Sequence, residues 1–392
     1  MKKIVCCLLA VITFMSFNTQ IFAVSGAEDA IFTSLTTPDF EVNAKSAVLM
    51  EANTGKILFC QNEDQKSSPA SVTKIMTLLL VMEAISDEKI SPEDTVVISE
   101  HAASMGGSQV FLEEGERMSV EELLKCAVIA SANDAAVALA EHVGGSEKIF
   151  VSMMNRRASE LGMENTNFEN VTGLDNSTQN HVTTAEDIAI MSRELIKYDL
   201  IKKYSSLWQD TIRDGEFTLT NTNRLVRYYE GCNGLKTGST DKAGYCISAT
   251  AERGGMQLIA VIMGAQTRDI RNAQAKALLD YGFANYAVFS RGESELETVD
   301  VLYGTKENVK LYSSPFCTVI PKSELKKVEL FYEIPEYVTA PIKTSEPVGR
   351  VTYKISGEVI GTSDIYSTEE IEKITFFEVF CRIFKTLLIS NR

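Results

Sequence analysis

The pattern of apolar and polar positions predicts strands at two distant places in the chain. Residues 46–51 and 56–60 are short apolar-rich runs joined by Asn53-Thr54-Gly55, which is typical of a β-hairpin. Similar short runs return only after residue 233. They cover residues 234–238, 245–250 and 257–264.

The region between these strands has the spacing of amphipathic helices. Ser119 with Glu122 three residues later forms a capping box before an apolar run that extends to residue 130. An alanine-rich run over residues 134–140 ends at Gly144-Gly145, and Thr184 begins a further helix. Another apolar series directly follows Pro69-Ala70, which places Ser71 at a helix N-terminus. Its members are Val72, Ile75, Met76, Leu79 and Met82.

Strands at both ends with helices between them predict one layered α/β domain over residues 38–288, closed by a helix over residues 268–286. Its sheet is expected to combine distant segments of the chain. Residues 292–367 contain short β-type runs broken by proline and glycine, and they predict a small all-β domain.

The final segment, residues 369–392, predicts an amphipathic helix. Seven apolar side chains share one helical face, opposite Glu378, Arg382 and Lys385. The central charges disfavour a spanning helix, so we expect it to lie in a membrane surface, with docking on the β-domain as the alternative. The apolar face consists of Phe376, Phe377, Phe380, Ile383, Phe384, Leu387 and Leu388.

The N-terminus has the order of a secretory signal peptide. Lys2 and Lys3 precede an apolar stretch over residues 4–17, and small residues follow around Ala23 and Ala27. The apolar stretch is shorter than the roughly 20 residues that span a bilayer. We therefore expect residues 1–27 to be a signal peptide cleaved near residues 23–27.

Composition and charge exclude several classes of function. The chain has 392 residues with 38 Lys and Arg against 53 Asp and Glu, a net charge of −15, and no basic block of the kind that binds nucleic acid. Its three histidines and the absence of paired Cys-x-x-Cys motifs argue against a metal site. His181 is interpreted as structural or as site-lining. Outside the signal segment, six widely spread cysteines are expected to be buried free thiols.

Three short motifs carry the candidate chemistry. Ser71-Val-Thr-Lys74 is a Ser-x-x-Lys at a helix start, Ser131-Ala-Asn133 follows at a break between two helices, and Lys236-Thr-Gly238 lies in a predicted strand. The first pattern alone is weak, because it also occurs at Ser86-Asp-Glu-Lys89 and Ser323-Glu-Leu-Lys326. The ordered set of three motifs is specific.

These residue types suit acyl transfer. Three residues along a helix, Lys74 shares a face with Ser71 and can remove its proton if the amine is neutral. Burial and a second cation, Lys236, would both lower the pKa of Lys74. Ser131 can relay a proton to a leaving amine, and Asn133 can orient the substrate backbone.

The backbone N–H groups of Ser71 and Ser239 can form an oxyanion hole. Lys236 and Thr237 can hold a substrate carboxylate.

The sequence resembles the penicillin-recognising serine enzymes, specifically the low-molecular-mass D-alanyl-D-alanine carboxypeptidases. The resemblance covers residues 38–288, and the β-domain and amphipathic tail also match the family's layout. The matching blocks are Pro69-Ala-Ser-Val-Thr-Lys-Ile-Met-Thr77, Asn133-Asp-Ala-Ala136, Gly173-Leu174, Gly234-Leu-Lys-Thr-Gly238, Ala243-Gly-Tyr-Cys246 and Thr267-Arg-Asp269.

The resemblance implies a β-lactamase/transpeptidase-like catalytic domain that removes the terminal D-Ala from peptidoglycan stem pentapeptides through an acyl-enzyme. It also implies acylation by β-lactams and action on the outer face of the cytoplasmic membrane, without a cofactor. By the same match, Ser71, Lys74 and Ser131 are catalytic. Substrate binding is assigned to Asn133, Lys236, Thr237, Gly238 and Ser239.

Three alternatives stay open. A class A β-lactamase would carry Glu-x-x-x-Asn between the second and third motifs and Ser-Asp-Asn as the second motif, whereas residues 134–235 lack the former and the chain has Ser131-Ala-Asn133. A D,D-endopeptidase would use the same residues. A non-catalytic, penicillin-binding wall or membrane scaffold would retain the side chains without turnover.

Overall fold

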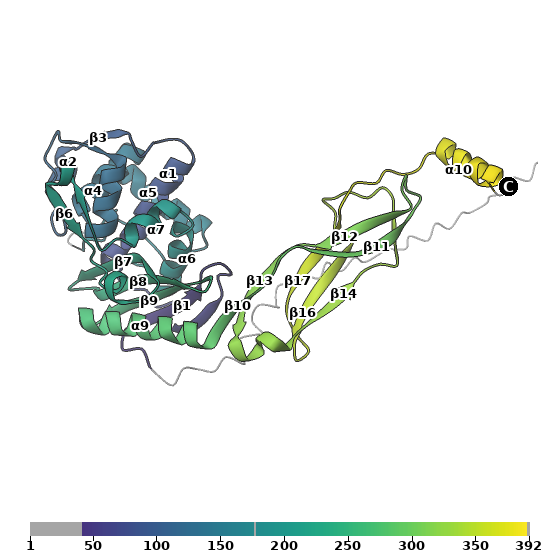
Figure 1. The fold of residues 1–392 in the computed structure, drawn as a ribbon. Coiled ribbons are helices and arrows are strands. Elements are labelled where there is room, and N and C mark those ends of the chain that lie inside the picture. The colour runs from purple at the N-terminus through teal and green to yellow at the C-terminus, as the bar shows by residue number, and fades with distance from the viewer. Residues whose placement is uncertain (1–40, 176–177, 390–392) are drawn as a thin grey trace, which may run out of the picture. The chain divides into compact units, whose positions relative to one another are not determined.

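A five-stranded antiparallel sheet forms the centre of the first folded region. The computed structural model describes residues 41–175 and 178–389, so the predicted signal peptide lies outside the described residues. The strand order is β2-β1-β9-β8-β7, which confirms a sheet assembled from distant segments (Figure 1). Its strands are β1 (Ser46–Glu51), β2 (Ile57–Gln61), β7 (Cys232–Thr240), β8 (Gly244–Arg253) and β9 (Met256–Ala265).

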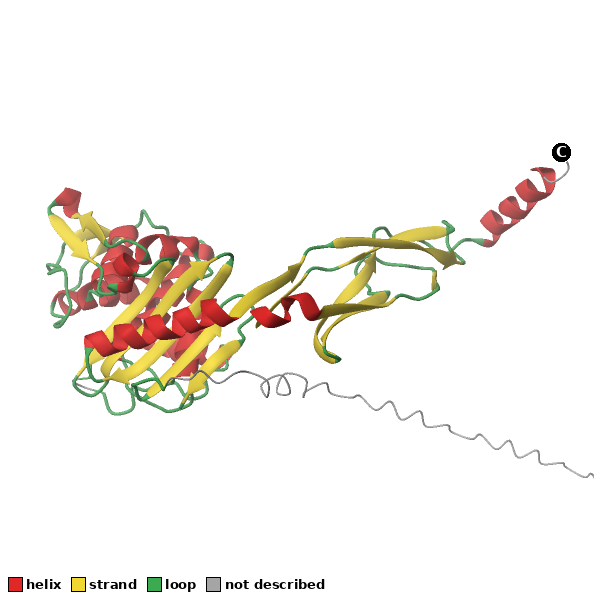
Figure 2. Ribbon diagram, turned by 60° about the horizontal axis from the view of Figure 1, so that its bottom comes forward, coloured by secondary structure: helices red, strands yellow, loops and turns green. Residues whose placement is uncertain are grey.

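Helices cover both faces of this sheet (Figure 2). All six residues of β1 and nine of the ten in β9 are buried, as expected for strands that are covered on two sides. Helix α9 (Arg268–Asn285) packs on β8 and β9, and α6 (Ala185–Leu195) packs on β1 and β9 from the helical layer. The predicted layered α/β architecture is therefore confirmed.

Helix α1 (Lys74–Ser86) lies at the centre of the helical layer. Ten of its 13 residues are buried, because apolar side chains occur on all sides of the helix. The remaining elements of this region are α2 (Glu100–Ala103), α3 (Val120–Lys125), α4 (Asn133–Gly144), α5 (Glu147–Glu160), α7 (Asp199–Ser205), α8 (Leu225–Tyr228), 3₁₀ turns at Ala70–Thr73 and Arg213–Gly215, and the strand pairs β3 (Thr95–Val97) with β4 (Arg117–Ser119) and β5 (Gln209–Ile212) with β6 (Phe217–Thr220).

The residues predicted to begin and end helices do so in the structure. Ser119 and Glu122 form the reciprocal capping box of α3, Thr184 caps α6, and Gly145 ends α4 in the left-handed conformation. One expectation needs correction. The helix expected to run to residue 130 is α-helical only to Lys125 and continues as a π-helix over Cys126–Ala130.

The second region is all-β, as predicted, and has its own core. Its six-stranded sheet has the order β14-β16-β17-β12-β11-β15, and β10 pairs with β13. The rings of Phe316 and Tyr353 stack in this core with centroids 4.1 Å apart. The elements are β10 (Tyr286–Arg291), β11 (Ser294–Leu302), β12 (Asn308–Ser313), β13 (Phe316–Pro321), a 3₁₀ helix (Lys322–Lys327), β14 (Val328–Glu333), β15 (Tyr337–Thr339), β16 (Gly349–Ile355) and β17 (Glu358–Ser367).

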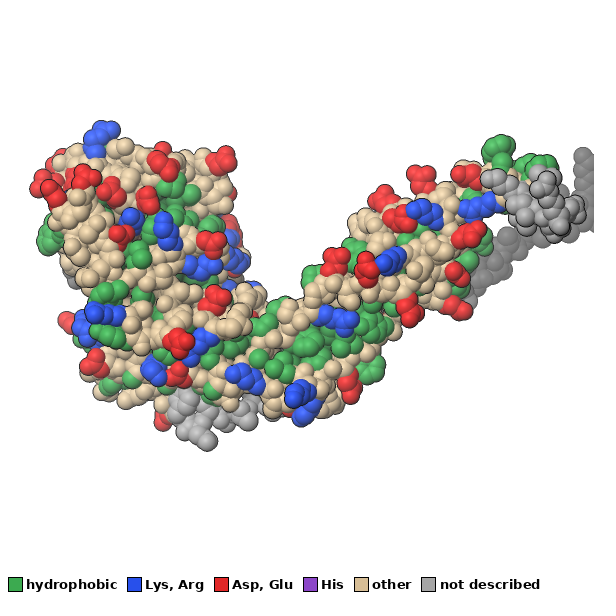
Figure 3. Space-filling view, viewed as in Figure 1, with side chains coloured by type: hydrophobic (Ala, Val, Ile, Leu, Met, Phe, Trp, Pro, Cys, Tyr) green, Lys and Arg blue, Asp and Glu red, His purple; other side chains and the backbone are tan. Residues whose placement is uncertain are grey.

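Helix α10 (Phe376–Ile389) is shorter than the segment predicted from the sequence. Residues 369–375 are not helical, and Ile371 is buried in the β-domain core, where it bridges to Ile342. Hydrophobic side chains gather on α10 (Figure 3), and Phe376 is 87% exposed. Among the described residues, no helix has the length and apolar character needed to cross a bilayer.

The cysteines correct one expectation. Cys126, Cys232 and Cys246 are buried free thiols as predicted, but Cys317 and Cys381 are exposed and Cys60 is half-buried. Cys317 lies on β13, and Cys381 on α10.

Candidate active site

The first motif places a hydroxyl and an amine on one face of consecutive helical turns. Ser71 lies in the 3₁₀ turn Ala70–Thr73, and Lys74 is the first residue of α1. Lys74 Nζ lies 3.1 Å from Ser71 Oγ, within hydrogen-bonding distance. Ser71 borders an open cavity, whereas Lys74 has no exposed surface. The hydroxyl of Ser71 therefore lies at the cavity, and the amine of Lys74 is buried next to it.

Two further acceptors surround the buried amine. Lys74 Nζ donates to Asn133 Oδ1 at 2.6 Å and to the carbonyl oxygen of Thr172 at 2.9 Å. Burial, followed by the positive charge of Lys236, holds the pKa of Lys74 well below 10.5, while Asp134 acts in the opposite direction. The environment thus favours a neutral amine next to Ser71.

The second and third motifs meet through another pair of side chains. Lys236 Nζ donates to Ser131 Oγ at 2.7 Å. Burial, with a contribution from Arg271, lowers the pKa of Lys236 to about 7. Ser131 follows the π-helix and has a φ of 63°, a left-handed conformation that is uncommon outside glycine and that occurs at functional sites.

Strand β7 passes directly beside the serine turn. A Cβ atom on Gly238 would lie 2.7 Å from the backbone nitrogen of Ser71, so only glycine allows this approach. Thr237 Oγ1 donates to Thr222 Oγ1 at 2.8 Å. Ser71, Ser131, Thr237, Gly238 and Ser239 all line one cavity of about 450 Å³.

The structure thus brings together the eight residues singled out in the sequence, in two groups. Six of them lie at or next to the cavity wall, and Lys74 and Asn133 lie behind Ser71. Asn133 Oδ1 accepts from Lys74, and Asn133 Nδ2 donates to the carbonyl of Gly106 at 2.6 Å. The Asn133 side chain is buried and is fixed by these two contacts.

Four residues that contribute to the site were not identified as site residues from the sequence. Thr172 acts through its backbone carbonyl, which carries no side-chain signal. Arg271 is buried at the cavity wall, one helical turn after the Thr267-Arg-Asp269 block that marks the start of α9. Arg224 and Arg268 also line the cavity.

The segment after Thr172 supports the serine turn from behind. A Cβ atom on Gly173, whose φ is 82°, would lie 1.8 Å from the carbonyl oxygen of Ala70. His181 Nε2 lies 2.8 Å from Thr73 Oγ1, and His181 Nδ1 accepts from the backbone of Glu169. Burial lowers the pKa of His181 to about 4. His181 is therefore structural and does not line the cavity.

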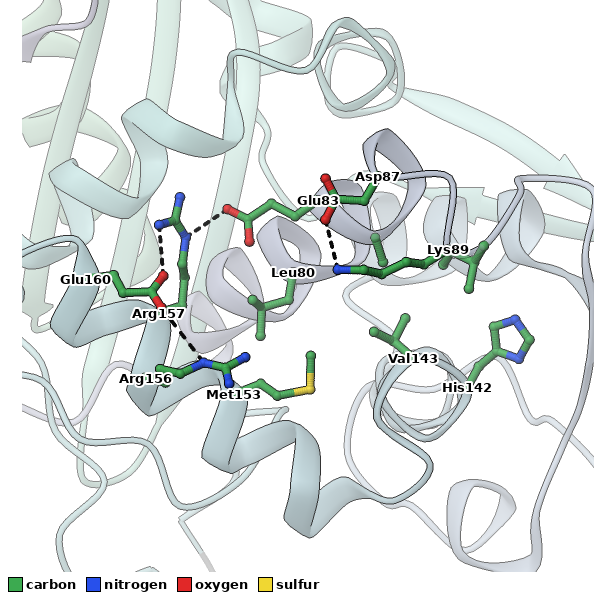
Figure 4. A pocket seen from close by; sticks show the side chains of 12 residues that line it. Leu80, Glu83, Asp87, Lys89, His142, Val143, Met153, Arg156, Arg157 and Glu160 are labelled. Carbon is green, nitrogen blue, oxygen red and sulfur yellow. Dashed lines mark hydrogen bonds and ion pairs between the residues drawn. The ribbon is translucent and has the colours of Figure 1, made fainter.

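A second cavity, of about 240 Å³, lies between α1 and α5 and contains none of the motif residues (Figure 4). Its charged groups pair with one another. Arg157 binds Glu83 at 2.8 Å and Glu160 at 3.2 Å, and Lys89 binds Asp87 at 2.8 Å. Within the described ranges, no group of three or more potential ligands could hold a metal ion.

Comparisons with known proteins identify the family of the chain. Residues 32–267 match the family described as D-alanyl-D-alanine carboxypeptidase, peptidase S11, and residues 283–373 match the C-terminal domain of penicillin-binding protein 5. The chain is 41% identical to D-alanyl-D-alanine carboxypeptidase DacF of Bacillus subtilis, over 96% of both chains.

Two solved structures extend the comparison. Penicillin-binding protein 5 from Haemophilus influenzae has a TM-score of 0.76 and 34% identity, and the match covers 86% of this chain and all of that chain. Penicillin-binding protein D2 from Listeria monocytogenes, in the ampicillin-bound form, has a TM-score of 0.58 and 32% identity, over 63% of this chain and all of that one. The chain therefore belongs to the D-alanyl-D-alanine carboxypeptidase family of low-molecular-mass penicillin-binding proteins.

Proposed function

We propose that the chain removes the terminal D-Ala from peptidoglycan stem pentapeptides, with Ser71 as the nucleophile. The observation that carries this proposal is the 3.1 Å contact between Ser71 Oγ and the buried amine of Lys74. A serine hydroxyl becomes an effective nucleophile when a positioned base removes its proton. An enzyme that acts on peptidoglycan works outside the cytoplasm.

The hydrogen bonds around Lys74 fit a neutral amine. A neutral Nζ has two N–H donors and one lone pair. Asn133 Oδ1 and the Thr172 carbonyl accept the two N–H bonds, which leaves the lone pair for the hydroxyl hydrogen of Ser71. Ser71 Oγ then attacks the carbonyl carbon of the scissile bond while its proton moves to Lys74.

The positive groups and backbone amides suit the later stages of the reaction. The N–H groups of Ser71 and Ser239 would stabilise the developing oxyanion. Ser131 accepts a hydrogen bond from Lys236 and would donate its own O–H proton to the leaving amine. It would then regain the proton that Lys74 took from Ser71, which leaves Lys74 neutral again. A water molecule, deprotonated by Lys74, would then hydrolyse the acyl-enzyme.

The substrate's terminal carboxylate would bind where positive charge and hydroxyl donors meet. Thr237 and Ser239 line the cavity together with the buried guanidinium of Arg271, and Lys236 lies directly behind them. β-Lactam antibiotics also carry a carboxylate, so the same groups would hold them during acylation of Ser71.

Release of D-Ala from a D-Ala-D-Ala peptide, measured beside hydrolysis of a β-lactam, tests this function. We expect D-Ala to accumulate over many turnovers, while a penicillin acylates the enzyme and is released slowly. Rapid β-lactam hydrolysis without D-Ala release would instead indicate a β-lactamase, and no release from either substrate would indicate a non-catalytic scaffold. Cleavage of a D-Ala cross-link would add endopeptidase activity.

We also propose that α10 holds the enzyme on the membrane surface. Phe377, Phe380, Ile383 and Phe384 are each more than half exposed, so these side chains are available to a lipid interface. Docking on the β-domain would bury such side chains.

Removal of residues 376–392 is expected to release the enzyme from membranes without abolishing activity on soluble peptides. The truncation begins at Phe376 because Ile371 belongs to the β-domain core. Sedimentation with vesicles measures membrane binding. A full-length variant with Phe380→Ser and Phe384→Ser removes two apolar side chains of α10 without shortening the chain, and therefore separates the effect of the apolar face from that of the truncation. If the truncated protein still sediments with vesicles, α10 is not the anchor.

A further inference from the structure

The substrate cavity has an unusual charge for this chain. Three arginines, Arg224, Arg268 and Arg271, line it, and no carboxylate side chain does, although the whole chain has a net charge of −15. A cavity that carries one sign of charge favours ligands of the opposite sign. One substrate carboxylate does not require three guanidinium groups.

The three arginines differ in burial and in bonding. Arg271 is only 3% exposed, and its guanidinium bonds to the carbonyl of Cys246 and to Asn272 Oδ1. It is the arginine best placed for the terminal carboxylate. Arg224 and Arg268 are exposed and make no ion pair or hydrogen bond with any other side chain in residues 41–175 and 178–389. Their charges are free to meet a ligand.

Arg224 and Arg268 line the same cavity as Arg271 and are near enough for their charges to act on it. The charges of Arg268 and Arg224 both contribute to lowering the pKa of Arg271 to about 10, after the larger effect of burial. The charge of Arg271 in turn contributes to lowering the pKa of Lys236, which donates a hydrogen bond to Ser131. Arg224 and Arg268 are therefore on the side of the cavity that receives the terminal carboxylate and the leaving group.

The position of Arg268 is unfavourable for the fold alone. Arg268 and Arg271 are in the first turn of α9, where the helix dipole disfavours positive charge. Asp269 in the same turn offsets part of this effect. A pair of cations at a helix N-terminus is better explained by a ligand than by helix stability.

We propose that Arg224 and Arg268 form a second carboxylate subsite that recognises an acidic leaving residue. This inference rests on the proposed function and names the substrate class for the leaving-group side. An acidic leaving residue carries two carboxylates, one at the chain terminus and one on the side chain, and is preferred over a neutral residue of the same shape. A cross-link through a diaminodicarboxylic acid presents the same two carboxylates when its second carboxyl group is not in a peptide bond.

The test compares three synthetic peptides that differ only in the last residue, D-Ala, D-Glu or D-Gln. D-Glu and D-Gln have nearly the same shape, so their ratio of kcat/KM isolates the charge. For two solvent-exposed ion pairs we expect a ratio of about fivefold in favour of D-Glu at low salt, decreasing as salt is added. In the double variant Arg224→Gln/Arg268→Gln the ratio should fall to about one.

Arg117→Gln is the matched control, because Arg117 is also exposed and lies outside the cavity. It should keep the wild-type ratio. A wild-type ratio of one, or a ratio that survives the double substitution, overturns the subsite while D-Ala release still supports the carboxypeptidase. If none of the three peptides is cleaved, the proposed function itself fails, and the subsite fails with it.

Discussion

Replacing Ser71 by alanine is expected to reduce D-Ala release by about 10⁶-fold, the scale seen when a serine hydrolase loses its nucleophile. The same change should abolish covalent labelling by a fluorescent penicillin, because no oxygen remains to form the ester. Steady-state release of D-Ala and the labelled band on a denaturing gel measure the two effects. The hydroxyl is half-buried at the cavity wall, so its removal should leave the fold intact.

The chain itself supplies matched controls for this variant. Ser86 and Ser323 also begin Ser-x-x-Lys sequences, but Ser86 is the last residue of α1 and Ser323 lies in the 3₁₀ helix of the β-domain, and both are exposed. Ser86→Ala and Ser323→Ala should keep full activity and labelling. Persistent labelling of Ser71→Ala would show that another residue is the nucleophile.

Replacing Lys74 by methionine is expected to slow acylation by about 10³-fold, within the range for loss of a general base. Methionine has a similar length, but its thioether sulfur is far too weakly basic to take the proton of Ser71. Stopped-flow measurement of penicillin acylation reports the step directly. Lys89→Met, at an exposed position on the surface, is the control and should not change the rate.

The pH dependence of acylation gives an independent check on Lys74. Because burial and Lys236 depress its pKa, the amine loses its proton below pH 10.5, and the wild-type rate should rise with pH through that depressed pKa. Lys74→Met should lose this rising limb along with most of its rate. A rising limb that is unchanged in Lys74→Met would assign the titration to a different group.

Short-range sequence signals were sufficient to predict the helices and strands and to identify the motif residues. The capping box at Ser119 and the stop at Gly145 are decided within one helical turn, so their structure follows from neighbouring residues. The motif spacing was informative because Ser71 and Lys74 are neighbours on one turn. Lys236, by contrast, was placed near them by the chemistry that the ordered set of three motifs suggests, since no short-range signal connects the two segments.

Features that depend on packing between distant segments were not predictable from the sequence. The carbonyl of Thr172 and the glycine requirement at Gly173 arise because that loop packs against Ala70, about a hundred residues earlier in the chain. The change from α- to π-helix before Ser131 likewise has no signal in the apolar pattern. The start of the amphipathic helix, predicted at residue 369, was wrong because Ile371 belongs to the β-domain core and the helix begins at Phe376.

The pairing of β1 with β9 has a consequence for biogenesis. Ser46 pairs with Met263, so the first strand finds its partner only after most of the enzyme has been synthesised. Contacts between such remote segments form slowly, because a long loop must close before they contribute. A nascent chain would therefore lack its central sheet until residue 265 had been synthesised. Such an unfolded chain is compatible with passage through an export channel.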